Sequence, residues 1–175
     1  MANRSDIINT LRKAYPDVDN CLLPSTGDAH VVDAGISQFS ADANIPGFDI
    51  SNPNNRPMFL LQIDGKLLTS SMRKVGQCDC AIVSDNEISF VELKTDAVAP
   101  NEKNCDKAEL QIFTTIMRIN WALSRAGASL VPLANLESYV CFKSYPAVNA
   151  ELQSRQLRFF NNTGVPLCYS NKKTL

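Results

Sequence analysis

Apolar positions recur with a helical period in three segments of the chain. A spacing of three to four positions predicts helices over residues 5–15, 106–126 and 150–160. Ser5 is expected to cap the first helix, because its hydroxyl can accept a hydrogen bond from a free N–H of the first turn. The apolar positions of the second helix, including a tryptophan that we expect in the core, are Leu110, Phe113, Thr114, Met117, Trp121 and Leu123.

Between the first two helices the chain carries apolar runs with the length and turns of strands. Residues 58–64 and 66–71 flank Asp64-Gly65, a dipeptide typical of two-residue hairpins. Residues 77–84 and 88–95 flank a second tight reversal at Asp85-Asn86. These patterns predict an antiparallel meander over residues 58–95.

The remaining segments complete the predicted order of elements. Residues 16–57 are rich in turn signals and are expected to be mostly loop, with one short strand over 30–36. Two further strands are predicted over 137–144 and 165–170, and Lys172 and Lys173 read as a tail. A hairpin-built sheet continued through helical crossovers predicts one α/β domain over residues 1–175, a mixed sheet with helices packed on its faces.

Composition and charge narrow the class of protein. The chain is 45% hydrophobic and 20% charged, as globular domains are, and its net charge is −1. Such a chain lacks the basic surface that binds nucleic acid by bulk electrostatics, so a polyanion would need a local patch or another subunit. We see neither an apolar run long enough to span a bilayer nor a secretory signal, and we expect a cytoplasmic protein without a membrane partner.

The six cysteines are expected to be free thiols in a reducing compartment. The sequence has no CxxC pair and its single histidine is His30, so the usual ligand pattern of a zinc site is missing. Alternation along a strand would place Cys78 and Cys80 on the face opposite Asp79. We therefore expect them to pack as small hydrophobic residues.

Charged residues inside two of the apolar runs are the main clue to chemistry. Asp79 lies in the first run, and Glu92 and Lys94 lie two positions apart in the second. Phe90, Glu92 and Lys94 share one strand face. Because the two strands are joined by a tight turn midway between Asp79 and Lys94, an antiparallel register can bring Asp79 beside Glu92 and Lys94.

Two carboxylates and an ammonium at one sheet edge fit a hard divalent cation. Mg²⁺ prefers carboxylate and carbonyl oxygens together with retained waters, so we expect Asp79, Glu92 and the Leu93 carbonyl as ligands. Lys94 would face the same site, where its charge can orient or help to deprotonate a water and offset charge on a phosphate oxygen. In phosphodiester hydrolysis the metal generates the nucleophile and stabilises the transition state.

The stretch "CDCAIVSDNEISFVELK" resembles the core motif of the PD-(D/E)xK nuclease superfamily. The resemblance implies a restriction-endonuclease-like fold with the order α-β-β-β-α-β, and catalytic roles for Asp79, Glu92, Lys94 and Gln111. It also implies a Mg²⁺- or Mn²⁺-dependent nuclease that hydrolyses phosphodiester bonds of DNA, in bacterial defence or DNA repair. Small members of this superfamily often act as homo-oligomers or as subunits of larger complexes.

Two departures from the family pattern leave alternatives open. Cys78 stands where many members have proline, and no glutamate precedes Glu87 to supply the acid that members often carry on the first helix. Asp6 and Asp49 are the candidates for that acid. One alternative is a catalytically inactive nuclease-fold subunit that docks on a partner through residues 16–57. Glu92 and Lys94 could also form an ordinary surface ion pair, or the acids could serve a small-molecule metalloenzyme.

Overall fold

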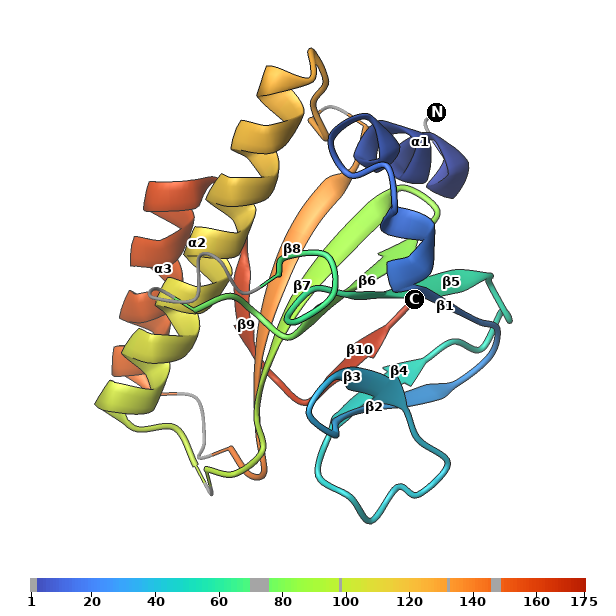
Figure 1. The fold of residues 1–175 in the computed structure, drawn as a ribbon. Helices are drawn as coiled ribbons and strands as arrows, with labels where there is room; N and C mark the ends of the chain where they lie inside the picture. Colours follow the sequence, from blue (N-terminus) through green and yellow to red (C-terminus); the bar gives the residue numbers. More distant parts are fainter. Residues whose placement is uncertain (1–2, 70–75, 98, 132, 146–148) are drawn as a thin grey trace.

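Three layers make up the fold: helices, a larger sheet and a smaller sheet (Figure 1). The computed structural model describes residues 3–69, 76–97, 99–131, 133–145 and 149–175. Within these residues the helices are α1 (Arg4–Ala14), α2 (Glu102–Arg125) and α3 (Ala150–Thr163), and a 3-10 turn spans Val18–Cys21. The expected α/β class is confirmed at this level.

The larger sheet has the strand order β1-β5-β6-β7-β8-β9. Its strands are β1 (Leu22–Ser25), β5 (Met58–Gln62), β6 (Cys80–Ser84), β7 (Glu87–Lys94), β8 (Asn135–Phe142) and β9 (Leu167–Tyr169). The strands from β1 to β7 pair antiparallel, whereas β8 and β9 run parallel to β7. The two parallel connections contain α2 and α3, as crossovers between parallel strands usually contain a helix.

The smaller sheet has the order β10-β4-β2-β3, and three of its strands come from the segment that the sequence predicted as loop. They are β2 (Ala29–Asp33), β3 (Ser37–Phe39) and β4 (Phe48–Ser51), joined by the C-terminal β10 (Lys172–Thr174). The prediction of a strand near residues 30–36 is confirmed, but the prediction of a mostly irregular 16–57 segment is wrong. Lys173 is also no tail residue, because it is buried and pairs with Glu87 and Glu137.

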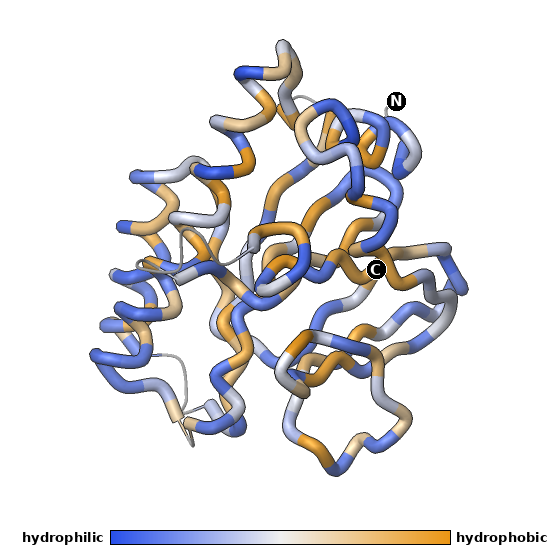
Figure 2. Tube along the Cα trace, viewed as in Figure 1, coloured by the Kyte–Doolittle hydropathy of each residue, from blue (hydrophilic) through white to orange (hydrophobic). Residues whose placement is uncertain are grey.

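Each face of the larger sheet covers its own hydrophobic core. The helical core holds Ile7 and Leu11 of α1 and Ile112 and Ile116 of α2, packed on alternate residues of β5 to β8. The other core joins the opposite residues of these strands to the smaller sheet. Figure 2 shows hydrophobic positions along the central strands, which are covered on both sides. Strands buried on both faces explain why their sequences read as near-continuous apolar runs.

The helix predictions are confirmed in existence and corrected in detail. α1 is capped by Asn3 rather than Ser5, and Asp6 closes the capping box. α2 begins at Glu102, where the Asn101 side chain accepts from the Asn104 N–H. The face of α2 that enters the core carries Cys105, Ala108, Ile112, Thr115, Ile116, Ile119 and Leu123. Trp121 is therefore exposed, contrary to the prediction that it lies in the core.

The predicted hairpin at Asp64-Gly65 is wrong in its described part. Gly65 has the expected left-handed φ of 74°, but residues 66–69 form no strand, and β5 pairs with β6 and β1 instead. Residues 70–71 of the predicted strand lie outside the described residues. A turn dipeptide indicates that the chain reverses, but it does not determine which strand pairs with β5. β5 pairs with β6, whose residues are all buried.

All six cysteines are free, five of them buried and Cys168 half-buried. Cys78 and Cys80 nevertheless pack in different cores, since the regular strand starts only at Cys80, and the predicted shared face is wrong. In the part of the chain that is described, no helix combines the length and the apolar character needed to cross a bilayer.

Candidate functional site

The charged residues of β6 and β7 meet at one end of the antiparallel pair. Cys80 pairs with Val91 in the register, so Asp79, one residue before β6, lies next to Glu92 and Leu93. The Leu93 N–H donates to Asp79 Oδ2 at 2.6 Å. The structure thus brings together the two acids that the sequence singled out, and the apolar register of β6 against β7 fixes their relation.

Lys94 links this pair to α2. Its Nζ forms an ion pair with Glu92 Oε1 and donates to Gln111 Oε1 at 2.9 Å. Lys94 and Glu92 share the strand face that points to the helices, as alternation along β7 requires. Asp79, Glu92, Lys94 and Gln111 therefore form one continuous polar group under α2.

Glu92 is the most deeply buried acid of this group. Its side chain is 1% exposed, and its Oε2 has no hydrogen-bond partner among the described residues. Burial raises the pKa of Glu92 well above its ordinary value, and the nearby charge of Asp79 raises it further against the lowering effect of Lys94. Lys94 compensates one oxygen of this buried carboxylate, and the second oxygen lacks the partner that burial normally requires.

Asp79 is half-buried, and its charged form is also disfavoured. Burial raises the pKa of Asp79 to about 7, although the Leu93 N–H and Lys94 favour its charged form. The negative charges of Asp33 and Asp64 raise the pKa further. Both acids thus hold their protons more tightly than free carboxyl groups, a property that clusters at functional sites.

A buried glutamine that the sequence reasoning missed extends the group. Gln77 is 3% exposed; its carbonyl accepts from Gln111 Nε2 at 3.0 Å, and its side-chain amide donates to Asp64 Oδ1 at 2.7 Å. Arg118 of α2 donates to Gln77 Oε1 at 2.6 Å. The signal for Gln77 was present, since a long polar amide directly precedes the apolar run that holds Asp79.

Gly76 allows α2 to approach closely the segment that precedes β6. Its φ is 73°, and a Cβ at this position would lie 3.1 Å from Gln111 Cγ. A side chain here would meet both a strained backbone and the glutamine. Gly76, Gln77, Gln111 and Asp64 line a cleft of about 360 Å³, which opens beside the polar group.

The two acids proposed from the sequence to complete the site have other partners. Asp6 Oδ2 accepts from the Asn3 N–H in the α1 cap, and Asp49 Oδ1 binds His30 Nδ1 at 2.6 Å. Over the described ranges, no three or more His, Cys, Asp and Glu residues are arranged to hold a metal ion. Asp79 and Glu92 are the two carboxylates of the polar group, and their role as metal ligands stays a prediction.

Leu93 contributes to the site through its backbone. Its side chain packs between the two sheets, and its N–H binds Asp79. The role of its carbonyl as a metal ligand stays a prediction.

Comparison of the chain with protein-family models, with curated proteins and with solved structures finds no match.

Proposed function

We propose that this protein is a metal-dependent nuclease that hydrolyses phosphodiester bonds of DNA at the group formed by Asp79, Glu92, Lys94 and Gln111. The observation that carries the proposal is Glu92, a buried carboxylate held between an acid and a lysine, with one oxygen that no described residue contacts by a hydrogen bond. Structures rarely bury such a group unless a ligand or a proton completes it.

The donor set fits a hard divalent cation. Mg²⁺ is commonly bound by one or two carboxylates and keeps several waters, so Asp79 and Glu92 would hold it without a third acid. The unpartnered Glu92 Oε2 and the raised pKa of Asp79 both fit a partner of positive charge. When bound, such a cation activates a water and neutralises charge on the phosphate.

The chain's own residues have distinct roles in this proposal. Glu92 Oε1 and Gln111 Oε1 orient the Lys94 ammonium. The ammonium can then donate to a phosphate oxygen or position the attacking water. Gln77 holds Gln111 in place through its carbonyl, so it is a positioning residue. The cleft beside Gln77 reaches this group at Gln111, which lines it.

The order of elements supports the restriction-endonuclease-like part of the proposal. The antiparallel run β5, β6 and β7 is followed by α2 and then by β8, parallel to β7. α1 precedes this run and packs on α2 in the helical core. The strands β1 to β4 are inserted between α1 and β5, which departs from the simplest α-β-β-β-α-β order.

A second candidate function is a catalytically inactive subunit with the same fold. The observation that favours it is the number of acids, because two carboxylates of the described residues meet where many active members of the resembled superfamily bring three. In this case the Glu92–Lys94 pair would serve stability alone.

Incubating the protein with plasmid DNA, single-stranded DNA and RNA, in Mg²⁺, Mn²⁺ or chelator, tests the proposal. We expect metal-dependent cleavage of DNA that falls at least about 100-fold in Glu92→Gln and Lys94→Ala, since both remove groups that act in the transition state. If the protein cleaves RNA and not DNA, the proposed substrate is wrong.

Matched control variants distinguish the effect of changing the site from the effect of changing the charge of the protein. Glu102→Gln and Lys103→Ala change the same residue types at exposed positions in the first turn of α2 and should cleave like the wild type. If all five proteins are equally inert with every metal, the enzyme proposal fails and the inactive subunit is favoured.

A further inference from the structure

Most of the cations of α2 lie along one side of the helix. At 100° per residue, Lys107, Arg118 and Arg125 fall within about 20° of one another, and we call these three residues the basic line. From residue 107 to residue 125 the line extends about 27 Å, at 1.5 Å per residue. Lys103, the remaining cation of α2, lies about 40° from Lys107 and beyond the end of the line, so it is not part of it.

The acids of α2 lie on the other side of the helix. Each of them is at least about 100° away from every residue of the basic line; they are Glu102, Asp106 and Glu109. Arg155 of α3 pairs with both Asp106 and Glu109 there. Over the described ranges, no ion pair joins a residue of the basic line to an acid of the chain. One side of α2 therefore carries uncompensated positive charge, although the net charge of the whole chain is −1.

The basic line passes the polar group under α2. Gln111 lies one turn after Lys107 on the same side of the helix, and its Oε1 accepts from Lys94 Nζ at 2.9 Å. Burial raises the pKa of Glu92, and the charge of Lys107 acts to lower it, so the Lys107 ammonium is near the site. The first residue of the basic line therefore adjoins the residues that are proposed to act on the phosphate.

The cleft beside the polar group lies between the first and second residues of the line. Gln77 and Gln111 line this cleft, which has a volume of about 360 Å³. Arg118 Nη1 donates to Gln77 Oε1 at 2.6 Å, which holds the guanidinium beside the cleft. A guanidinium has five N–H donors, so the remaining ones can still bind a phosphate. A strand held by Lys107 and Arg118 would therefore cross the cleft at Gln111.

An exposed tryptophan accompanies the last residue of the line. The Arg125 guanidinium lies over the Trp121 ring at 4.9 Å from its centroid, and Trp121 is 59% exposed. Proteins that bind single strands combine cations along the backbone with aromatic side chains. A single line of cations also suits one backbone, whereas a duplex presents two backbones about 6 or 12 Å apart across its grooves. These features favour a single strand over a duplex.

We propose that the basic line of α2 binds the phosphates of one DNA strand on both sides of Gln111, so that the strand passes Lys94. The choice of DNA rests on the nuclease function proposed above. The line provides the local patch that a chain with a net charge of −1 needs to bind a polyanion.

Fluorescence anisotropy of a labelled single-stranded DNA of about 16 nucleotides, in chelator, measures this binding without cleavage. Lys107→Ala/Arg125→Ala should raise the dissociation constant about 20-fold or more near 0.1 M salt. The slope of log K against log salt should become shallower by about 1.4, because each lost phosphate contact removes about 0.7. Arg56→Ala/Lys172→Ala is the matched control, since it removes one exposed arginine and one exposed lysine outside α2, and it should bind like the wild type.

Equal binding by the two double variants overturns the proposal. It is also overturned if the wild type does not bind the strand at about 100 µM, or binds a duplex of the same length as tightly. An RNA strand that binds more tightly than the DNA strand would show that DNA is the wrong nucleic acid. Lys107→Arg/Arg125→Lys keeps both charges and should bind like the wild type, and a loss of binding in this variant contradicts a role for charge.

Trp121 gives a second measurement that needs no variant. It is the one tryptophan of the chain, and Arg125 lies over its ring, so a strand bound at Arg125 should change its fluorescence emission. Binding with unchanged emission would place the strand elsewhere and overturn the proposal.

The binding assay in chelator also separates this inference from the nuclease function. A strand that binds through the basic line but is never cleaved in any metal supports the inference and counts against the nuclease. Cleavage of DNA by a wild type whose binding is the same in both double variants supports the nuclease and overturns the inference.

Discussion

Burial and mutual repulsion disfavour the charged forms of Glu92 and Asp79 in the folded protein. Burial raises the pKa of Glu92, and the nearby charge of Asp79 raises it further; within the described part of the chain, one oxygen of Glu92 has no hydrogen-bond partner. The residues that oppose this cost are Lys94 and the Leu93 N–H. A folded chain that carries such a group gains stability from whatever neutralises it, whether a proton or a cation.

The pKa of Asp79 predicts how stability changes with pH in chelator. Because the folded pKa is about 7 and the unfolded value is 3.8, the folded state binds the proton more tightly between these limits. The contribution of this group to the free energy of unfolding should therefore be greatest below about pH 4, fall as pH rises from 4 to 7, and stay constant above 7. Urea unfolding at several pH values, in wild type and Asp79→Asn, measures this dependence.

The asparagine keeps an oxygen for the Leu93 N–H but has no proton to lose in this range. We expect the fall in stability between pH 4 and 7 to be smaller in Asp79→Asn, which should be more stable than the wild type at pH 8. Identical pH profiles for the two proteins would show that Asp79 has an ordinary pKa.

Gly76 gives a second prediction at the residue scale. Gly76→Ala should lower the free energy of unfolding by about 1–2 kcal/mol, since alanine is strained at positive φ and its Cβ would press on Gln111. Gly127→Ala is the control, because Gly127 also has positive φ, at 64°, but no atom within 4 Å of the added Cβ. Equal losses in the two variants would mean that the approach to Gln111 contributes nothing.

At the scale of elements, α2 shows what a hydrophobic period can and cannot predict. The period correctly indicated a long helix, but α2 has two apolar stripes, and the more conspicuous one, with Trp121, faces outward. The buried stripe combines Ile112, Ile116 and Ile119 with small residues such as Ala108 and Thr115, and the prediction followed the larger side chains of the outward stripe instead. Periodicity predicts that a helix forms, whereas the neighbouring sheet decides which stripe is buried.

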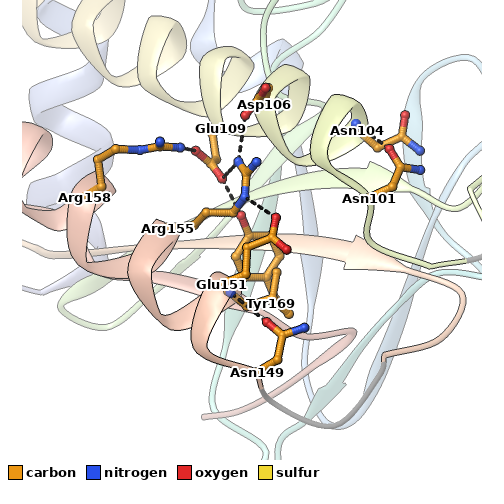
Figure 3. A network of polar contacts seen from close by, with 10 residues as sticks. Asn101, Asn104, Asp106, Glu109, Asn149, Glu151, Arg155, Arg158 and Tyr169 are labelled. Atoms are coloured by element: carbon orange, nitrogen blue, oxygen red, sulfur yellow. Dashed lines mark hydrogen bonds and ion pairs between the residues drawn. The ribbon is translucent and has the colours of Figure 1, made fainter.

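An ionic network joins α2 to α3 and β9 (Figure 3). Glu109 accepts from Arg155 at 3.0 Å, Arg158 at 3.2 Å and Tyr169, and Arg155 also binds Asp106 and Glu151. Glu109 and Arg155 are 8% and 7% exposed. Breaking such a buried pair leaves an uncompensated charge, which costs far more than losing an exposed pair.

Glu109→Gln should therefore lower the free energy of unfolding by about 3 kcal/mol, because Arg155 would keep its charge in a buried place and lose the partner that is buried with it. Glu151→Gln provides the control, since Glu151 also pairs with Arg155 but its side chain is 66% exposed, and we expect a loss under about 1 kcal/mol. Chemical denaturation of both variants measures the difference. Comparable losses would show that the network is effectively solvated.

β10 contains a second buried ion pair, which allows a similar test near the C-terminus. Lys173 is 8% exposed and pairs with Glu87 and Glu137, while its neighbour Lys172 is exposed. Lys173→Ala should cost about 3 kcal/mol of unfolding free energy, since two partly buried glutamates would lose their cation. Lys172→Ala should cost under about 0.5 kcal/mol, as exposed substitutions usually do. An equal fall in the melting temperature of both variants would show that Lys173 contributes no more to stability than Lys172, as expected of a tail residue.

For the whole molecule, local and distant pairings differ in how far the sequence predicts them. β6 and β7 are adjacent in the chain and joined by a tight turn, so their register and the meeting of Asp79 with Glu92 followed from the sequence. The smaller sheet did not, because its strands are three to five residues long and β10 pairs with β4 across most of the chain. The contacts of Gln77 with Arg118 and Asp64 likewise depend on distant segments.

The stability of the whole molecule should respond to the cation that the site is proposed to hold. At pH 8, Mg²⁺ at about 100 times its dissociation constant should add about 2.7 kcal/mol to the free energy of unfolding, a rise of about 5–10 °C in Tm for a chain of this size. The rise has a clear physical source, since the cation would relieve the repulsion between Asp79 and Glu92 and supply a partner for Glu92 Oε2. Melting curves in Mg²⁺ and in chelator should therefore differ in the wild type and coincide in Asp79→Asn. Asp85→Asn, which removes an exposed acid from the turn between β6 and β7, should keep the full shift. A shift of the same size in Asp79→Asn would place the bound cation elsewhere on the protein and remove the main support for metal-dependent chemistry at this site.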